Sequence, residues 1–153
     1  LSNLSNAKAK IGSYPFTTLK PQLGLFREYD KDIVLADLPG LIKGASKGTG
    51  LGLKFLAHVE RCKVLLHVCD ISVVNNLEEN YSIIRKELDE YSDKLKYKNE
   101  IIVLSKCDLV DKKIILKVKN SLGKITKSKI IPISSHTKFG INELKKVLHK
   151  IFK

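Results

Sequence analysis

Four short apolar runs divide the chain, and their length predicts buried β-strands rather than helices. They are Ile33–Ala36, Val64–Cys69, Ile101–Leu104 and Ile130–Ile133. Each run ends at a polar residue, and these residues are Asp37, Asp70, Ser105 and Ser134. Because α/β sheets carry their sites at the carboxyl ends of the strands, we expect a functional site where these runs end.

Apolar residues at helical spacing separate the predicted strands. Positions three and four apart form apolar stripes in residues 77–95, 115–122 and 141–151. Asn75 or Asn76 is suited to cap the first of these helices, and Gly123 is suited to end the second. Upstream, Gln22–Glu28 and Asp32–Asp37 flank a short turn, which predicts an antiparallel hairpin.

The alternation of strands and helices predicts an α/β fold with a mainly parallel sheet and flanking helices. At 153 residues, of which 43% are hydrophobic, the chain has the size of one domain with a real core. We therefore expect residues 1–153 to form a single domain. No segment is long and apolar enough to span a bilayer, and three cysteines without metal-ligand spacing favour a reducing cytoplasm.

The formal net charge of +12 at pH 7 suits a phosphate-rich partner such as RNA or the ribosome. Nearly all of this charge comes from lysine, because Arg27, Arg61 and Arg85 are the only arginines. The lysines are spread over every predicted helix. A protein that is lysine-rich for other reasons would look the same, so charge alone leaves nucleic-acid binding open.

The sequence DLPG, Asp37–Gly40, has the chemistry of a magnesium and phosphate site. A carboxylate at a strand end can hold Mg²⁺ through water, and a glycine lets a backbone N–H approach a phosphate oxygen. Just upstream, YPFTTL carries two adjacent threonines, Thr17 and Thr18, in a predicted loop. Taken alone, DLPG is explained at least as well by an ordinary turn after a strand.

Two further motifs follow the last two predicted strands. In SKCD, Ser105–Asp108, the carboxylate of Asp108 can accept the ring N–H and the exocyclic amine of guanine, while the stem of Lys106 lies along the purine. Adenine presents the opposite pattern at that edge. In SSHTKFG, Ser134–Gly140, backbone N–H groups can contact the guanine carbonyl oxygen. Each motif alone is also compatible with a solvated loop.

The order of these motifs carries more information than any one of them. Paired threonines, DLPG, SKCD and a serine-rich loop follow one another at α/β spacing, as in the switch and base motifs of GTPases. The stretches AKAKIGSYPFTTLKPQLGLF and ADLPGLIKGASKGTGLGLKFLAHVERCKVLLHVCD resemble the Obg family of ribosome-associated GTPases. The resemblance covers almost the whole chain. The related Obg-like ATPases lack the aspartate of the guanine motif, so Asp108 favours GTP.

This resemblance implies a P-loop-type G domain that binds GTP and GDP with Mg²⁺, hydrolyses GTP slowly, and acts in ribosome assembly. It assigns the nucleotide contacts to Phe16, Thr17, Thr18, Leu19, Lys20, Asp37, Leu38, Pro39, Gly40, Ser105, Lys106, Cys107, Asp108, Ser134, Ser135 and His136. Thr18 and Asp37 would hold the metal. No residue is assigned as catalytic. The implied partner is the large ribosomal subunit or its RNA, and we expect a monomer without a membrane span.

The chain departs from the family pattern in several places. Ser105 replaces an asparagine, Ser135 replaces an alanine, and Leu41 stands where many regulatory GTPases carry a glutamine that orients water. The chain contains no G-x-x-x-x-G-K-[S/T] phosphate loop, so we expect an incomplete G domain that lacks its first strand and is inactive alone. The alternative is a basic RNA- or ribosome-binding module that has lost nucleotide chemistry.

Overall fold

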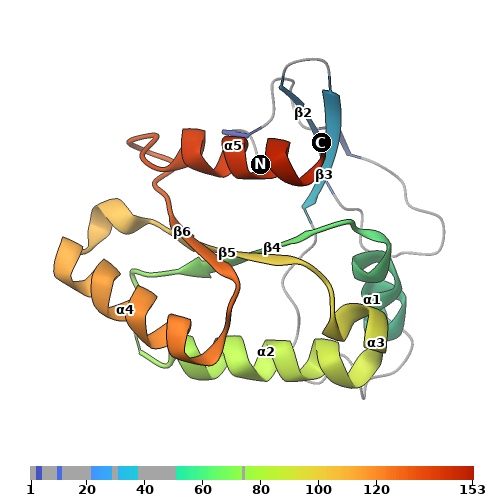
Figure 1. Cartoon of the computed structure of the whole chain (residues 1–153), viewed down its shortest axis with the longest axis horizontal. Helices are drawn as coiled ribbons and strands as arrows, with labels where there is room; N and C mark the ends of the chain where they lie inside the picture. Colours follow the sequence, from blue (N-terminus) through green and yellow to red (C-terminus); the bar gives the residue numbers. More distant parts are fainter. Residues whose placement is uncertain (1–2, 5–9, 12–21, 29–30, 38–50, 74) are drawn as a thin grey trace. The chain divides into compact units, whose positions relative to one another are not determined.

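The structure is a computed structural model that describes residues 3–4, 10–11, 22–28, 31–37, 51–73 and 75–153 (Figure 1). It divides into two compact units. The first comprises residues 1–41 with residues 141–153, and the second comprises residues 42–140. The described strands form two separate sheets, β1-β2-β3 and β4-β5-β6, one in each unit.

In its described residues, the first unit holds an antiparallel sheet and the helix α5. Its strands are β1 (Lys10–Ile11), β2 (Gln22–Glu28) and β3 (Lys31–Asp37), and its helix is α5 (Ile141–Ile151). The predicted hairpin is confirmed, because β2 and β3 pair antiparallel with Phe26 opposite Ile33. Both of these side chains are buried, and the Lys145 ammonium lies 5.6 Å from the centroid of the Phe26 ring.

The second unit is an α/β layer built on a parallel sheet. Its strands are β4 (Leu65–Asp70), β5 (Glu100–Ser105) and β6 (Lys129–Pro132), with β5 in the middle. Its helices are α1 (Leu51–Arg61), α2 (Leu77–Tyr91), α3 (Asp93–Lys96), the 3₁₀ turn η1 (Cys107–Leu109) and α4 (Lys112–Ile125). The predicted parallel pairing of these three strands is therefore confirmed.

The core of this unit lies between β5 and two helices. Residues 101–104 of β5 are buried on both faces of the sheet, as a central strand requires. Figure 1 shows α2 and α4 on the same side of the sheet, and their buried residues meet Ile102 and Leu104 of β5 in one apolar cluster. Tyr81 and Leu77 join it from α2, and the central part of α4 joins it through Val118.

The helices differ from the sequence predictions at their ends. The stripe predicted over residues 77–95 is split, because Ser92 is extended and its hydroxyl accepts a hydrogen bond from Leu95 N at 3.3 Å, which starts α3. Asn76 occupies the N-cap of α2 in the left-handed region, with no side-chain capping bond. Helix α4 continues past Gly123 to Ile125, since a glycine weakens a helix without forcing it to end.

Candidate functional site

The carboxyl ends of β4, β5 and β6 bring the second half of the predicted site together. The parallel register places Asp70 opposite Ser105 and Leu104 opposite Pro132. The loop after β5 carries Lys106 and η1, and the loop after β6 carries Ser134–Gly140. The predicted guanine-contacting residues therefore lie at the end of β5 and on the loops after β5 and β6, all within one unit.

Lys106 is fixed by an ion pair at this edge. Its Nζ lies 2.6 Å from Oδ2 of Asp70, and its backbone adopts the left-handed conformation with φ of 59°. The other oxygen of Asp70 accepts hydrogen bonds from the Ser72 hydroxyl at 2.6 Å and from Ser72 N at 3.0 Å. The hydrogen bond from Lys106, followed by those from Ser72, holds the pKa of Asp70 below its usual value. Asp70 is thus an ionised anchor for the lysine.

Ser105 is tied to the neighbouring strand. Its hydroxyl donates to the Cys69 carbonyl at 3.1 Å, and its own carbonyl accepts from Ile71 N at 3.1 Å. The family's asparagine would offer both a donor and an acceptor at this position, whereas the serine here uses its donor on the sheet itself. The start of the base loop is therefore held by β4.

The two base loops are joined through the backbone. Cys107 N donates to the Ile133 carbonyl at 3.1 Å, and Ile133 N donates to the Leu104 carbonyl at 2.7 Å. The Cys107 side chain is buried in the apolar cluster below the loop, and burial raises the pKa of its thiol. Cys107 is therefore a small buried hydrophobic residue, and its backbone connects the loops.

Asp108 and Ser134 meet across this junction. Hydrogen bonding from the Ser134 side chain, with a smaller contribution from the charge of His136, lowers the pKa of Asp108 below its usual value. Asp108 is exposed, whereas Ser134 is fully buried, so the carboxylate stands at the surface and the hydroxyl lies in the interior. An exposed, ionised carboxylate can accept two N–H groups from one ligand.

The loop after β6 closes tightly upon itself. Ser134 N donates to the Phe139 carbonyl at 3.0 Å, and the Ser134 hydroxyl accepts from Thr137 N at 3.0 Å. Gly140 ends the loop with φ of 71°, and a Cβ there would lie 2.1 Å from the Pro132 carbonyl oxygen. Glycine is therefore required at this position. Ser135 and His136, both exposed, lie on the outer part of this loop.

The first half of the predicted site falls mostly outside the described residues. These positions are Phe16, Thr17, Thr18, Leu19, Lys20, Leu38, Pro39 and Gly40. Asp37 is described, and it is an exposed residue at the end of β3 in the first unit. Its carboxylate has the oxygen chemistry that Mg²⁺ prefers, and it is thus one suitable ligand within the described part of the chain.

Sequence reasoning missed a buried polar cluster at the opposite end of the parallel sheet. Glu100, the first residue of β5, accepts hydrogen bonds from Tyr81 OH at 2.9 Å and lies 3.0 Å from His67 Nδ1. Burial favours the neutral forms of both groups, but the contacts of His67 with Cys69 and Glu100 raise its pKa to about 9. The pKa of Glu100 is lowered by His67, Tyr81 and Arg85 despite its burial.

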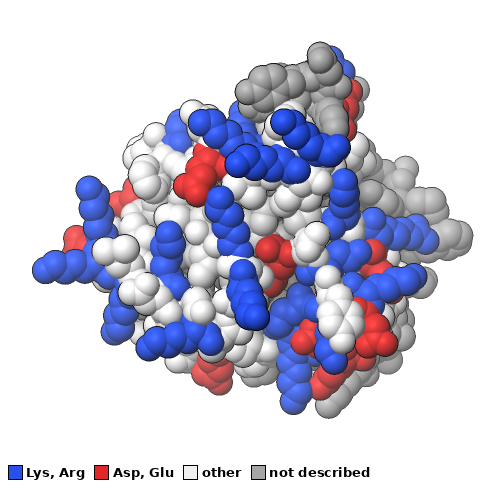
Figure 2. All heavy atoms as spheres, in the orientation of Figure 1, with Lys and Arg blue, Asp and Glu red and all other residues white. Residues whose placement is uncertain are grey.

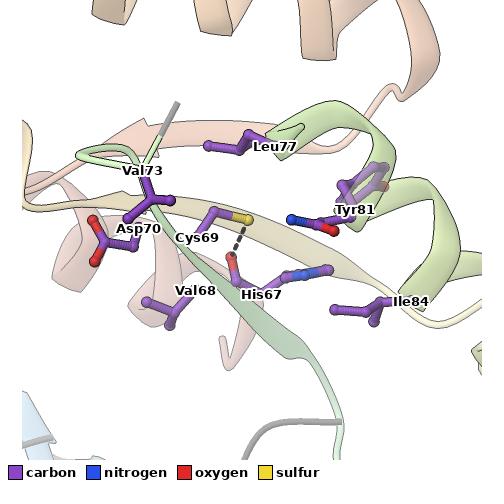
Figure 3. Close-up of a pocket in the computed structure, with 9 residues that line it drawn as sticks. His67, Val68, Cys69, Asp70, Val73, Leu77, Tyr81 and Ile84 are labelled. Atoms are coloured by element: carbon purple, nitrogen blue, oxygen red, sulfur yellow. Dashed lines mark hydrogen bonds between the residues drawn. The ribbon is translucent and has the colours of Figure 1, made fainter. Parts of the chain in front are cut away.

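A cavity of about 200 Å³ lies between β4 and α2 (Figure 3). Figure 3 shows His67, Cys69 and Asp70 around it from β4, with Tyr81 and Leu77 from α2, and the Cys69 thiol donating to the His67 carbonyl at 4.0 Å. Neither Asp108 nor Ser134 is among the described residues that line it. The cavity and the proposed base site share Asp70, which lines the cavity and pairs with Lys106.

Two negative observations apply to the described residues. No three or more histidine, cysteine, aspartate or glutamate side chains gather there in a way that could hold a metal ion. No helix in the described part of the chain is long and apolar enough to cross a membrane.

The family match and the similar proteins agree on one class of protein, the GTPases. The family described as "50S ribosome-binding GTPase" matches residues 1–106. The GTPase Obg of Rickettsia felis is 48% identical over 153 residues, and that of Rickettsia prowazekii is 49% identical over 154; both alignments cover 100% of this chain. They cover 46% of each relative, so the chain spans less than half the length of these proteins.

Solved structures give the same fold at lower identity. The G domain of the T. maritima FeoB iron transporter matches 99% of this chain and 88% of its own, with a TM-score of 0.69 and 18% identity. The cytosolic domain of the same transporter in its GMPPNP form matches 99% of this chain and 57% of its own, with a TM-score of 0.71 and 19% identity. The predicted G-domain fold is therefore confirmed.

Proposed function

Because the chain belongs to the Obg family of GTPases, within the 50S ribosome-binding GTPases, we propose that it forms the guanine-recognition and switch part of a GTP-hydrolysing protein. The family supports a GTP-binding switch as the general function. The particular roles of residues in this chain, its metal and its ribosomal partner are our proposals.

The observation that supports guanine recognition best is the junction of the two loops, where Cys107 N donates to the Ile133 carbonyl at 3.1 Å between the neighbouring residues Asp108 and Ser134. Two loops that follow different strands converge there, and an ionised carboxylate stands exposed above a buried hydroxyl. Asp108 accepts the ring N–H and the exocyclic amine of guanine. Lys106, held by Asp70, lays its stem along the purine, and Ser135 and His136 border the base with their backbone.

The phosphate side of the nucleotide belongs to the earlier motifs. Thr18 and Asp37 hold Mg²⁺, which supplies charge neutralisation at the β- and γ-phosphates. By the family pattern, residues 16–20 belong to the first switch and residues 37–40 begin the second, and the γ-phosphate contact is assigned to the backbone N–H of Gly40. Leu41 cannot hydrogen-bond an attacking water, and hydrolysis in the parent protein is therefore slow without a partner or an ion.

The 153 residues alone bind GTP weakly. The sequence contains no phosphate loop, whose backbone amides and lysine would cradle the β- and γ-phosphates. The chain retains the proposed base contacts of residues 105–108 and 134–136. Electrostatic contacts to the phosphates, however, supply much of the affinity at such sites. The complete parent protein acts in the cytoplasm on the large ribosomal subunit, in its assembly.

Substitution of Asp108 tests the proposed base site in the parent protein. Asp108→Asn exchanges an acceptor for a donor, which suits xanthine rather than guanine. We expect GTP affinity to fall about tenfold or more, as for the loss of a charge-assisted pair, while xanthosine triphosphate affinity rises. Unchanged GTP affinity without any gain for the xanthine nucleotide refutes the assignment. Asp111→Asn, three positions along the chain, is the matched control.

A further inference from the structure

Positive charge is unevenly distributed between the helices of the second unit. Helix α2 carries five acidic and two basic residues, whereas α4 carries five lysines and no acidic residue. The lysine-rich stretch extends beyond the helix to residue 129, still without an acidic residue. Figure 2 shows lysine and arginine side chains projecting around the left-hand part of the view, where Figure 1 places α4. Among the described helices of this unit, α4 therefore carries the largest net positive charge.

The lysines of α4 occupy one side of the helix. At 3.6 residues per turn, all five fall within an arc of about 160° that lies opposite the buried residues Val118 and Leu122. They are Lys112, Lys113, Lys117, Lys119 and Lys124. Within the described part of the chain, none of these five lysines forms an ion pair. The arc is a positively charged face without internal compensation, and we call it the α4 basic face.

The lysines at the start of the α4 basic face lower the stability of the helix itself. Lys112 and Lys113 lie in the first turn, where the helix dipole and the free N–H groups already create positive potential. Asp111 precedes them but makes no side-chain capping bond. Positive charge at this end opposes helix formation, whereas it attracts an anion. Binding of an external anion therefore explains the positions of Lys112 and Lys113 better than helix stability does.

Gly123 provides a second, independent observation. It lies within the arc of the α4 basic face, and a Cβ at this position would meet no atom within 4 Å. Neither packing nor a left-handed backbone requires glycine there, although glycine costs an exposed helix about 1 kcal/mol relative to alanine. A missing side chain on the outer face of a helix lets the backbone of a partner approach closely.

We propose that the α4 basic face binds the phosphate backbone of RNA. Five lysines along a helix about 21 Å long can pair with a row of phosphates. The open space at Gly123 lets the RNA strand lie between the lysine side chains. A membrane surface fits less well, because Val118 and Leu122 are buried within the protein and Leu116 is the single apolar side chain within the arc of the lysines. That the bound RNA is ribosomal RNA depends on the proposed function. RNA binding itself is inferred from the α4 basic face alone.

Fluorescence anisotropy of the 153-residue chain with a labelled RNA hairpin, over a series of salt concentrations, tests this proposal. Lys113→Gln, Lys117→Gln and Lys124→Gln together should weaken binding about tenfold or more and reduce the salt slope by about 2 to 3. The matched control removes three lysines from other helices of the same unit: Lys86→Gln, Lys94→Gln and Lys96→Gln. It should change affinity by less than about twofold, as expected for charges far from a phosphate contact.

The experiment has clear contrary outcomes. Equal losses for the two triple variants would mean that binding depends on net charge alone, and no loss for the α4 variant, or no binding by the natural chain, would also overturn the proposal. Binding to phosphatidylserine vesicles in preference to RNA would assign the face to membranes instead. Gly123→Gln should weaken RNA binding at unchanged net charge, with circular dichroism confirming that the fold is retained.

The α4 triple variant also separates this inference from the proposed guanine site. Its changes leave Lys106, Asp108 and Ser134 untouched, so guanine nucleotide binding by the parent protein should not change. Loss of RNA binding with normal nucleotide binding supports the α4 basic face. A parent protein that binds RNA through this face but no guanine nucleotide would refute the proposed function and leave this inference standing.

Discussion

The Nζ atom of Lys106 lies 2.6 Å from Oδ2 of Asp70, and this ion pair joins the loop after β5 to the carboxyl end of β4. Both side chains are partly exposed, so the pair itself stabilises the fold by less than about 1 kcal/mol. Its main effect is to restrict where the lysine stem can lie. Asp70 is thus a positioning residue for a side chain that we propose contacts the base.

Substitution of Asp70 tests this role. Asp70→Asn keeps an oxygen that can accept from Ser72 but removes the charge that holds Lys106. We expect the affinity of the parent protein for GDP to fall several-fold, about threefold to tenfold, with a change in unfolding free energy below about 1 kcal/mol. Calorimetry and urea unfolding measure the two quantities. Glu90→Gln, which breaks the exposed Lys86–Glu90 pair, should alter neither.

The threonines of the first switch should respond differently to the two nucleotides. Thr18→Ala removes the proposed hydroxyl ligand of Mg²⁺, and it should slow GTP hydrolysis by the parent protein about tenfold to a hundredfold while sparing GDP affinity. Single-turnover kinetics and GDP titration provide the two readouts. Thr17→Ala is the neighbouring control. Equal losses for GDP and GTP would indicate a folding role instead.

Stability should fall as the pH rises through the titration of His67. Its pKa in the folded protein is raised to about 9, so the charged form contributes stability fully below the unfolded value near 6.5 and loses it between about pH 6.5 and pH 9. The loss should be about 1 to 3 kcal/mol of unfolding free energy. Urea titrations across this range measure it.

Variants of the cluster identify the group responsible. His67→Gln should flatten the dependence between about pH 6.5 and pH 9, whereas exposed His136→Gln should leave it intact. Glu100 contributes in the opposite direction: its lowered pKa stabilises the fold above its usual value of 4.5, and this is lost in acid as the folded protein takes up a proton. An unchanged slope in His67→Gln contradicts the proposed charge state.

Two glycines should give opposite results when replaced by alanine. Gly140→Ala places a Cβ 2.1 Å from the Pro132 carbonyl oxygen in a left-handed backbone, and it should destabilise the fold by about 2 kcal/mol or more. Gly123→Ala fills open space on a helix and should stabilise it by up to about 1 kcal/mol. Thermal unfolding of both variants measures the difference, and a stabilised Gly140→Ala would show that the loop is not constrained as described.

The sequence patterns predicted the strands well because each strand is a short apolar run. The central strand, residues 101–104, is buried on both sides and therefore reads as continuously apolar. Chemistry and order at Lys106, Asp108 and Ser134 led to the prediction of two base-contacting loops, and the structure joins these loops by the hydrogen bond from Cys107 N to the Ile133 carbonyl. Their contact with a base stays a prediction. In contrast, β1 has two residues, Lys10 and Ile11, too few to display any period.

Other features escaped the sequence patterns because they depend on tertiary contacts. Glu100 looks like a polar residue before a strand, and only the parallel register, which pairs Leu65 with Glu100, brings His67 within reach of its carboxylate. Asp70 was expected at a strand end, but its ion pair with Lys106 requires the two strands to end side by side. The break between α2 and α3 depends on the local capping bond of Ser92, which the apolar stripe does not reveal.

The backbone bond from Cys107 to the Ile133 carbonyl lies entirely within one unit, together with every residue proposed to contact the base. The surface that we propose contacts the base is therefore contained within residues 42–140, which include neither of the proposed Mg²⁺ ligands Thr18 and Asp37. Free guanine, which carries neither ribose nor phosphate, is consequently the smallest ligand that this surface should distinguish. Guanosine analogues that extend from the base rather than the phosphate end are thus the natural starting compounds for inhibitors of the parent protein.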